Sequence, residues 1–342
     1  MKIAIPELTA RCRELLALAG VPDLAARRTA ETLVSADARN IHSHGVVRLA
    51  RYIDCIQSGG IRPDAEVLIL DEGPAFLRAS ANGGLGIPAS CEAVERLIAK
   101  ARTMPLAAAA VNHSDHYGPA GYYAMKCADA GLIGFSMSNT CPLIAVTGAK
   151  TAGIGNNPFA YAAPAGKYRA VLFDICMSVV ASGKIILAAG DDKPIPEGWI
   201  LDKHGKPTTD PHAIFDGAIM LPLGGHKGYG LAMMVEMLSG VLADAGTLSG
   251  VHSWNTVPGE DANTGHFFMT INPAFFGGLD HFTARMENVI AELTSAPRAE
   301  GVNKIYYPGE LEFISEAKAL AEGIDLPAAS AAELDRAEKL LR

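Results

Sequence analysis

Side chains that can move protons and bind a carboxylate lie close together in the segment Ser43–Arg48. A histidine titrates near neutral pH, and an arginine holds a carboxylate through two parallel hydrogen bonds. If the segment is helical, His44 and Arg48 are four residues apart and project from the same face. The segment therefore predicts acid–base chemistry on a small carboxylate. The alternative is an ordinary helix start with Ser43 as the N-cap residue.

A second histidine cluster, His113–Gly121, follows the strongly apolar run Ala107–Val111. Loops that leave a buried strand and lead into a helix are where α/β proteins place ligand-binding groups. The alternative is that His113 or His116 only caps the helix or bonds a buried carbonyl group. No carboxylate lies at a recognisable ligand spacing from either histidine, so we expect no metal site.

Two glycine-rich segments match nucleotide-binding motifs only in part. Residues Gly84–Ala89 fit the pattern G-x-G-x-x-A after a strand-like run, but no acidic residue follows about 20 positions later. Pro88 also removes an N–H group that would face a phosphate, so we expect a plain turn into a helix. The segment Gly224–Gly230 is not a Walker A motif, yet Lys227 at a helix start could bind an anion.

The pattern of apolar residues divides the chain into three kinds of segment. Helical periodicity with closing glycines covers 6–19, 22–39 and 46–57. Between 66 and 154 short apolar runs alternate with helical patterns, and after 160 strand-like pieces flank a helix expected at 227–242. The alternation predicts an α/β class. We predict a helical region formed by 1–65 with 308–342, and α/β regions at 66–125 and 140–307.

Composition and charge favour a folded protein with small-molecule partners. The 342-residue chain is 49% hydrophobic and 19% charged, which is ample for a buried core. A formal net charge of -8 without a sustained run of Lys or Arg argues against nucleic acid and against an anionic membrane. The six cysteines are scattered, and no signal peptide or membrane span is recognisable, so we expect a cytoplasmic protein.

Six sequence blocks, in order along most of the chain, together resemble the type 2 malate/L-lactate dehydrogenase family. Two blocks depart from the family pattern. Asn156 stands where the family usually has Thr, and Ile175-Cys176-Met177 stands where it has Met-Ala-Thr. The first change replaces a hydroxyl by an amide that both donates and accepts, so we expect the far end of the substrate to differ. The blocks are Ile41–Arg48, His113–Tyr123, Gly155–Pro158, Phe173–Ser178, Leu221–Gly230 and Tyr307–Glu310.

The resemblance implies both a fold and a reaction. Members of the family transfer a hydride between NAD or NADP and carbon C2 of a small 2-hydroxy or 2-oxo carboxylate, or of a cyclic imine carboxylate. The implied fold is α/β (α+β) and non-Rossmann, with a largely antiparallel nicotinamide-binding sheet domain, a helical N- and C-terminal region and a further α/β domain. The regions 66–125 and 140–307 would then bind cofactor and substrate. A homodimer with the active site near the subunit interface is also implied.

The resemblance assigns roles to residues at matching positions. His44 resembles the family's proton donor or acceptor, with Ser43 as its relay partner, and Arg48 resembles the residue that binds the substrate carboxylate. His116 matches the acid/base proposed for the ureidoglycolate branch, so the histidine that moves the proton stays open. The substrate-contacting positions are matched by Asn156, Ser182 and Gly183. The cofactor-contacting positions are matched by His116, Tyr117, Gly118, Pro119, Ala120, Thr140, Asp174, Ile175, Cys176, Lys227, Arg298, Gly301 and Lys304.

The cofactor and the substrate are not fixed by these motifs. Arg298 or Lys304 could bind the 2′-phosphate of NADP, whereas Glu300 could hold the free ribose hydroxyl of NAD, and we favour NAD. Our main interpretation is a dehydrogenase of a malate-like, lactate-like or ureidoglycolate-like 2-hydroxy acid. The alternative is an NADPH-dependent reductase of pyrroline-2-carboxylate or piperideine-2-carboxylate.

Overall fold

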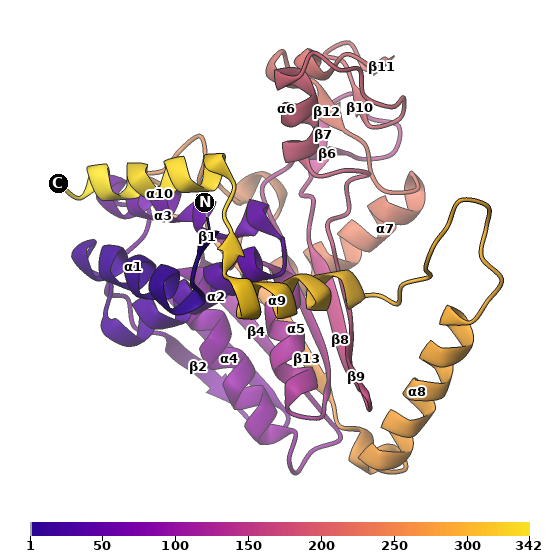
Figure 1. Ribbon diagram of the computed structural model, residues 1–342. Coiled ribbons are helices and arrows are strands. Elements are labelled where there is room, and N and C mark those ends of the chain that lie inside the picture. Colours follow the sequence, from indigo (N-terminus) through magenta and orange to yellow (C-terminus); the bar gives the residue numbers. More distant parts are fainter. Residues whose placement is uncertain (1) are drawn as a thin grey trace.

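The computed structural model describes residues 2–342, and its centre is a seven-stranded sheet (Figure 1). The strand order is β2-β3-β4-β13-β5-β8-β9, and every neighbouring pair is antiparallel except β3 with β4. The expected α/β (α+β) class with a largely antiparallel sheet is therefore confirmed. The strands span Leu68–Glu72 (β2), Phe76–Gly84 (β3), Leu106–Ser114 (β4), Ile133–Ser138 (β5), Phe159–Ala165 (β8), Tyr168–Ile175 (β9) and Thr264–Ile271 (β13).

Alternate residues of the central strand β4 enter two different hydrophobic cores, as the period of two in a strand requires. Ala107, Ala109 and Val111 belong to the larger core, whereas Ala108 and Ala110 pack in the second core. Both faces of β4 are thus covered, which explains its continuous apolar run. The larger core contains α4 (Gly86–Lys100) and α5 (Ala120–Asp129), and the second contains α7 (His226–Val235).

The two ends of the chain form the helical part of the molecule. The strands β1 (Lys2–Ile3) and β14 (Ile324–Asp325) pair and tie the ends together, and α10 packs against α3, as Figure 1 shows. The structure thus brings 2–65 and 310–342 side by side, although the exact division of the chain into domains stays a prediction. The helices are Ile5–Leu18 (α1), Asp23–Ala38 (α2), Leu49–Ser58 (α3), Glu310–Glu322 (α9) and Ala328–Leu340 (α10).

A smaller lobe projects from the sheet at the top of Figure 1. It holds a five-stranded sheet in the order β11-β10-β12-β6-β7 and one helix, α6 (Ser182–Gly190). The helix expected at 227–242 returns from this lobe, but only α7 is α-helical, because Glu236–Val241 form a π-helical turn. The short strands are Ile144–Ala145 (β6), Ala152–Ile154 (β7), Ile200–Leu201 (β10), Pro207–Thr208 (β11) and Ile219–Met220 (β12).

The glycines of the G-x-G-x-x-A segment serve packing. The segment joins β3 to α4, because β3 and β4, the parallel pair of the seven-stranded sheet, need a crossover helix between them. Residues 84–90 are all buried, and a Cβ on Gly86 would lie 2.0 Å from the carbonyl oxygen of Asp115. The loop after β4 therefore covers the start of α4, and this turn has no room for a phosphate.

The helix α8 (Leu279–Thr294) and the connection from 295 to 309 extend away from the sheet as an arm on the right of Figure 1. Ile290 is the buried residue of α8, and the connection is largely exposed. Within residues 2–342, no helix is both long and apolar enough to cross a membrane. The same part of the chain contains no grouping of three His, Cys, Asp or Glu side chains suited to a metal ion.

Candidate active site

The segment from His42 to Arg48 is not one helix, so the expected helical spacing of His44 and Arg48 is wrong. It consists of two single turns of 3-10 helix, His42–His44 and Val46–Arg48, and α3 begins only at Leu49. Gly45 separates the turns with an extended backbone (φ -87°, ψ -152°). The two side chains nevertheless reach the same site, because His44 stacks on His116 and Arg48 lies over Trp254, which also stacks on His116.

A buried carboxylate, that of Asp37 on α2, holds this double turn in place. Its Oδ2 accepts a hydrogen bond from the Val46 amide and its Oδ1 lies 2.7 Å from Nδ1 of His42. A Cβ added to Gly45 would lie 2.2 Å from Asp37 Oδ2, closer than real atoms approach. Glycine at position 45 thus allows the carboxylate to sit against the turn, and Asp37 positions the backbone that carries His44 and Arg48.

The Gly45→Ala variant is expected to lower the free energy of unfolding by about 1–3 kcal/mol, as overpacked interiors do. The added methyl group must displace Asp37 or the turn, so kcat/KM is expected to fall as well. Denaturant unfolding and steady-state kinetics measure the two effects. The control is Gly190→Ala at the end of α6, where a Cβ meets no atom within 4 Å. Equal stability of both variants would contradict the role given to Gly45.

Three rings and a guanidinium group form a stack across the site. The ring centroids of His44 and His116 are 5.6 Å apart, and those of His116 and Trp254 are 4.5 Å apart with an interplanar angle of 9°. The guanidinium carbon of Arg48 lies 5.7 Å from the centroid of the Trp254 ring. The structure therefore brings together His44 and Arg48 with His116, which the sequence places about 70 residues away.

The guanidinium group of Arg48 is oriented but has no acidic partner. Its Nε donates to the carbonyl oxygen of Ser43 at 2.6 Å, and no carboxylate within residues 2–342 forms an ion pair with it. Burial is the largest cause that lowers the pKa of Arg48, and the positive charge of Arg51 lowers it further. Tyr52 opposes this shift. A largely desolvated, unpaired guanidinium is costly, and a ligand carboxylate would supply the missing charge.

Burial shifts the pKa of the two stacked histidines and of Asp115. It lowers the pKa of His44 to about 4, with a further contribution from Arg48, and it lowers the pKa of His116 well below the usual value, helped by His44 and Arg48. Both imidazoles are therefore neutral at pH 7. Burial also raises the pKa of Asp115 to about 7, against the bond it accepts from the His116 amide. Neighbouring histidines with strongly shifted pKa values are typical of functional sites.

The loop His116–Ala120 lies between this stack and the edge strand β9. Oδ2 of Asp174 on β9 accepts a hydrogen bond of 2.7 Å from the amide of Gly121, directly after the loop. Burial raises the pKa of Asp174 to about 6, although the same amide bond lowers it. Asp174 with its neighbours Ile175 and Cys176 therefore borders the loop, as the matched cofactor positions require.

Thr140 and Asn156 form a second small group at the entrance to the smaller lobe. Oγ1 of Thr140 donates to Oδ1 of Asn156 at 3.1 Å, and its amide donates to Oδ1 of the buried Asn157. Asn157 in turn donates to the buried carboxylate of Glu236, which lies at the π-helical turn. This chain of bonds fixes Asn156, whose Nδ2 has no acceptor within residues 2–342 and can donate to a ligand.

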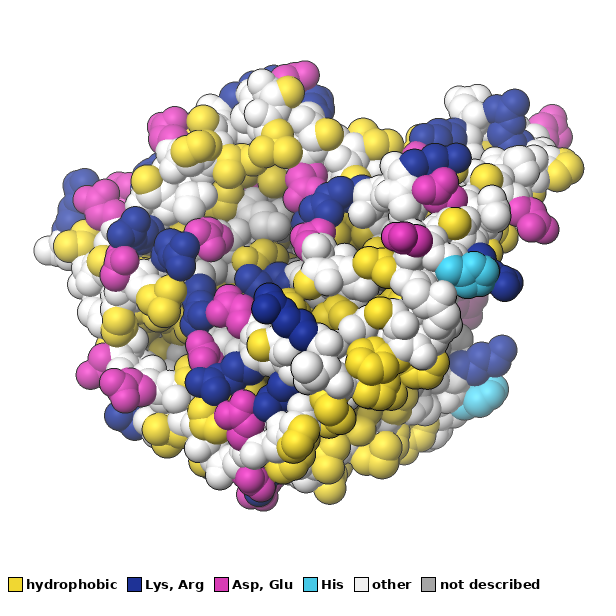
Figure 2. Space-filling model, turned by 90° about the horizontal axis from the view of Figure 1, so that it is seen from below, with side chains coloured by type: hydrophobic (Ala, Val, Ile, Leu, Met, Phe, Trp, Pro, Cys, Tyr) yellow, Lys and Arg dark blue, Asp and Glu magenta, His cyan; other side chains and the backbone are white. Residues whose placement is uncertain are grey.

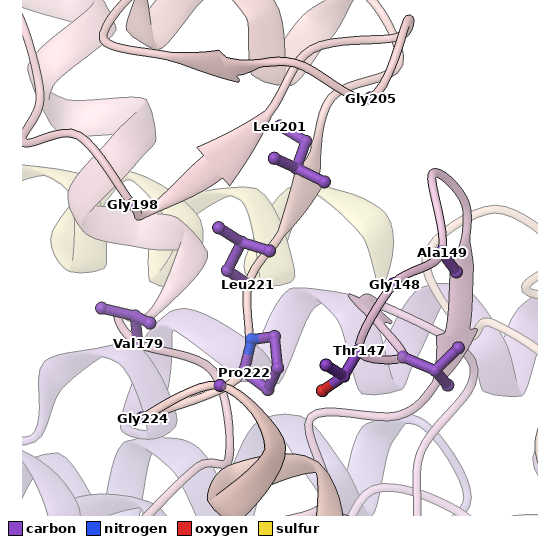
Figure 3. A pocket seen from close by; sticks show the side chains of 12 residues that line it. Thr147, Gly148, Ala149, Val179, Gly198, Leu201, Gly205, Leu221, Pro222 and Gly224 are labelled. Carbon is purple, nitrogen blue, oxygen red and sulfur yellow. The ribbon is translucent and has the colours of Figure 1, made fainter.

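The remaining predicted residues lie elsewhere and make no contact with the histidine stack within residues 2–342. Ser182 and Gly183 begin α6 in the smaller lobe, and Lys227 lies in the first turn of α7, exposed and without an acidic partner. Arg298, Gly301 and Lys304 lie on the exposed connection before α9. A cavity of about 470 Å³ lies beside the glycines that precede Lys227, and Figure 3 shows its largely apolar lining of Val179, Leu201, Leu221, Pro222 and Thr147.

Four residues of the site were missed by the analysis of the sequence: Asp37, Tyr52, Asp115 and Trp254. The hydroxyl oxygen of Tyr52 lies 2.6 Å from Nδ1 of His116, and its ring packs against Trp254. A signal for Tyr52 was present, since it follows Arg48 by four residues at the start of a helix. No sequence signal connects Trp254 or Asp37 with the histidines, because only the fold brings them there.

Comparison with known proteins places the chain in a family. The family model described as malate/L-lactate dehydrogenase matches residues 3–335. A malate dehydrogenase of Pyrococcus abyssi is 39% identical, over 95% of this chain and 91% of that protein. A ureidoglycolate dehydrogenase (NAD(+)) of Escherichia coli O157:H7 is 35% identical, over 95% of this chain and 93% of that protein.

A solved structure agrees with this assignment. The structure of delta1-piperideine-2-carboxylate reductase from Pseudomonas syringae superposes with a TM-score of 0.88 at 32% identity, covering 99% of each chain. The fold is thus that of a nicotinamide-dependent oxidoreductase. The chain belongs to the malate/L-lactate dehydrogenase family, which confirms the resemblance of its six sequence blocks.

Proposed function

We propose that this enzyme transfers a hydride to or from C2 of a small 2-oxo or 2-hydroxy carboxylate. The observation that carries the proposal is Arg48, an oriented and partly buried guanidinium with no acidic partner among residues 2–342, beside two neutral histidines. Arg48 binds the substrate carboxylate, and the C2 oxygen then faces His44 and His116. Fixing the carboxylate aligns C2 for the reaction, which is where an enzyme gains from orientation. Asn156 Nδ2 donates to the far end of the substrate, with Ser182 and Gly183 beyond it.

The residues at the matched cofactor positions fit a nicotinamide dinucleotide. Gly225 has positive φ and a Cβ there would meet no atom within 4 Å, so the turn before the exposed Lys227 leaves space for an anionic pyrophosphate. His116–Ala120, Thr140 and Asp174–Cys176 would hold the nicotinamide end. When bound, this cofactor supplies or accepts the hydride. The protein's task is to orient C2 and to manage one proton.

NAD is the cofactor we propose, because the candidate cations for a 2′-phosphate are already engaged. Nζ of Lys304 lies 2.5 Å from Oε1 of Glu310, and Arg298 donates to the carbonyl oxygen of Asn303. Glu300 and Gly301 lie on the same exposed connection. A clear preference for NADPH over NADH in turnover would contradict this choice.

The experiment that tests the function is a substrate panel in the reductive direction with NADH and with NADPH. Pyruvate, oxaloacetate, sulfopyruvate and oxalurate represent the 2-oxo acids, and oxidation of the 2-hydroxy acids is the reverse assay. We expect turnover of at least one 2-oxo acid and none of the matching ketone without a carboxylate. Absence of turnover over the whole panel would contradict the proposal.

A reductase of cyclic imines is the second candidate. It is supported by the Pseudomonas syringae relative, a Delta(1)-pyrroline-2-carboxylate/Delta(1)-piperideine-2-carboxylate reductase that is 32% identical over 99% of this chain. In this candidate Arg48 binds the carboxylate in the same way, and the C=N bond beside it takes the place of the C=O bond. Pyrroline-2-carboxylate and piperideine-2-carboxylate therefore belong in the panel, and a kcat/KM for them above that of every 2-oxo acid would favour this candidate.

The pH dependence of reduction is expected to reflect a histidine whose pKa rises when substrate binds. In the free enzyme burial and the positive charge of Arg48 lower the pKa of His44 to about 4. A bound carboxylate offsets the Arg48 charge, so this pKa rises in the complex. For reduction, which needs protonated His44, kcat/KM falls as pH increases above about 4, and the corresponding decline of kcat lies at higher pH. If kcat/KM and kcat declined over the same pH range, substrate binding would not raise the pKa of His44, and the prediction would be contradicted.

We also propose a cytoplasmic homodimer. The six cysteines are free, and four of them are buried, which suits a reducing compartment. Large apolar side chains are exposed along α7 and its π-helical turn and near the start of α8. Figure 2 shows hydrophobic side chains gathered over part of the face that is seen from below. Exposed patches of this kind typically mark an interface. Light scattering is expected to give twice the mass of the 35.8 kDa chain.

A further inference from the structure

Nδ1 of His116 faces two hydrogen-bond donors. The amide of Gly118 donates to it at 3.3 Å, and the hydroxyl oxygen of Tyr52 lies 2.6 Å from it. A backbone amide can only donate, so a proton on Nδ1 would point at another proton. The Tyr52 hydroxyl must then donate as well, because Nδ1 carries no hydrogen to offer. The neutral His116 ring is therefore protonated on Nε2.

His44 is in the opposite situation. The one partner of its Nδ1 within residues 2–342 is the hydroxyl of Ser43, at 2.9 Å. A hydroxyl donates to an unprotonated nitrogen and, after rotation, accepts from a protonated one. His44 can thus gain or lose a proton and keep its hydrogen bond, whereas His116 cannot. Ser43 is exposed, so this exchange has a route to solvent.

We propose that Tyr52 and the Gly118 amide hold His116 as the Nε2-protonated tautomer, so that His116 donates a hydrogen bond to the substrate's C2 oxygen while His44 carries the transferred proton. The inference rests on the proposed function. In reduction, the hydride that bound NADH would supply, becoming NAD+, forms the new C–H bond at C2, and the C=O π electrons move to oxygen. That oxygen takes the Nε2 proton of the His44 imidazolium, which becomes neutral and keeps Nδ1–H on Ser43. Oxidation reverses each step.

Tyr52 acts here as a positioning residue. Its hydroxyl has no partner other than His116 within residues 2–342, and burial raises its pKa well above the usual value, so it stays a neutral donor. Trp254 and His44 both stack on the His116 ring and restrict its rotation. The His116 Nε2–H is thereby preorganised as a donor to developing charge on oxygen, which is an effective form of catalysis.

The first test reads the tautomer directly, without turnover. Nitrogen-15 NMR of histidine-labelled enzyme, with the His116 signals assigned through His116→Gln, is expected to show an unprotonated Nδ1 and a protonated Nε2 from pH 6 to 8. In Tyr52→Phe one of the two donors is lost, and we expect a mixture of tautomers. A protonated Nδ1 in the unmodified enzyme would overturn the proposal.

The second test separates positioning from general stability. Tyr52→Phe is expected to lower kcat about 10-fold, as the loss of one hydrogen bond does, with little change in the KM of the 2-oxo acid. The control Tyr122→Phe, on α5 away from the stack, is expected to keep both constants. An unchanged kcat in a folded Tyr52→Phe enzyme would overturn the role of Tyr52. If no panel substrate is turned over, the proposed function fails while the NMR result still decides the tautomer.

Discussion

The Arg48→Lys variant is expected to lose about 100-fold in kcat/KM for any 2-oxo acid, although its charge is kept. Arg48 can bind a carboxylate through two parallel N–H groups, because its Nε is fixed on the Ser43 carbonyl oxygen. A lysine offers one flexible ammonium group and cannot make this planar contact. KM is expected to rise, and kcat to fall, because the carboxylate both binds the substrate and aligns C2.

A matched control is available three residues further along the chain, at Arg51. Arg51 lies on α3 near Asp54, with 3.6 Å between Nη1 and Oδ2, and does not belong to the ring stack. Arg51→Lys is expected to leave kcat/KM within a factor of about two, as a surface ion pair contributes little. Steady-state kinetics on both variants decide the question. An unchanged kcat/KM in Arg48→Lys would remove Arg48 from the site.

Removal of His44 is expected to have the largest effect on the chemical step. The His44→Gln variant loses the group that can change protonation, and we expect kcat to fall about 1000-fold, within the range for general acid–base catalysis. In the same variant, kcat should no longer decline as the pH increases. The His116→Gln variant loses a ring N–H but gains an amide N–H that still donates, so we expect a smaller decrease of about 10–100-fold with the pH dependence retained.

His113→Gln serves as the control for both variants. This histidine is exposed, 3.7 Å from Asp261, and lies outside the stack. Measurement of kcat over pH 5 to 9 with saturating substrate distinguishes the two losses. Loss of the proton-transferring His44 removes the pH dependence, whereas loss of the hydrogen-bond donor His116 keeps it. If His116→Gln abolished the pH dependence and His44→Gln kept it, the roles of the two histidines would have to be exchanged.

Much of the fold follows from local patterns. The periodicity predicted α1 and α2 close to where they lie, and the apolar run Ala107–Val111 lies in β4, because period and apolar runs are local properties. The segment Val46–Arg48 was predicted as the start of a helix over 46–57, because its apolar spacing continues that of α3. The carboxylate of Asp37, which holds the turn open, comes from another helix and leaves no trace in that spacing.

By itself, the sequence determined the family and the α/β class, and it proposed Ser43, His44, Arg48 and His116 as candidate site residues, because these signals lie within short motifs. Only the tertiary structure decided how these residues are used. It placed Trp254 on His116, left Arg48 without an acidic partner, and aimed Tyr52 and the Gly118 amide at the same nitrogen. Such choices depend on which donors face an atom across the fold, and spacing along the chain carries no information about that.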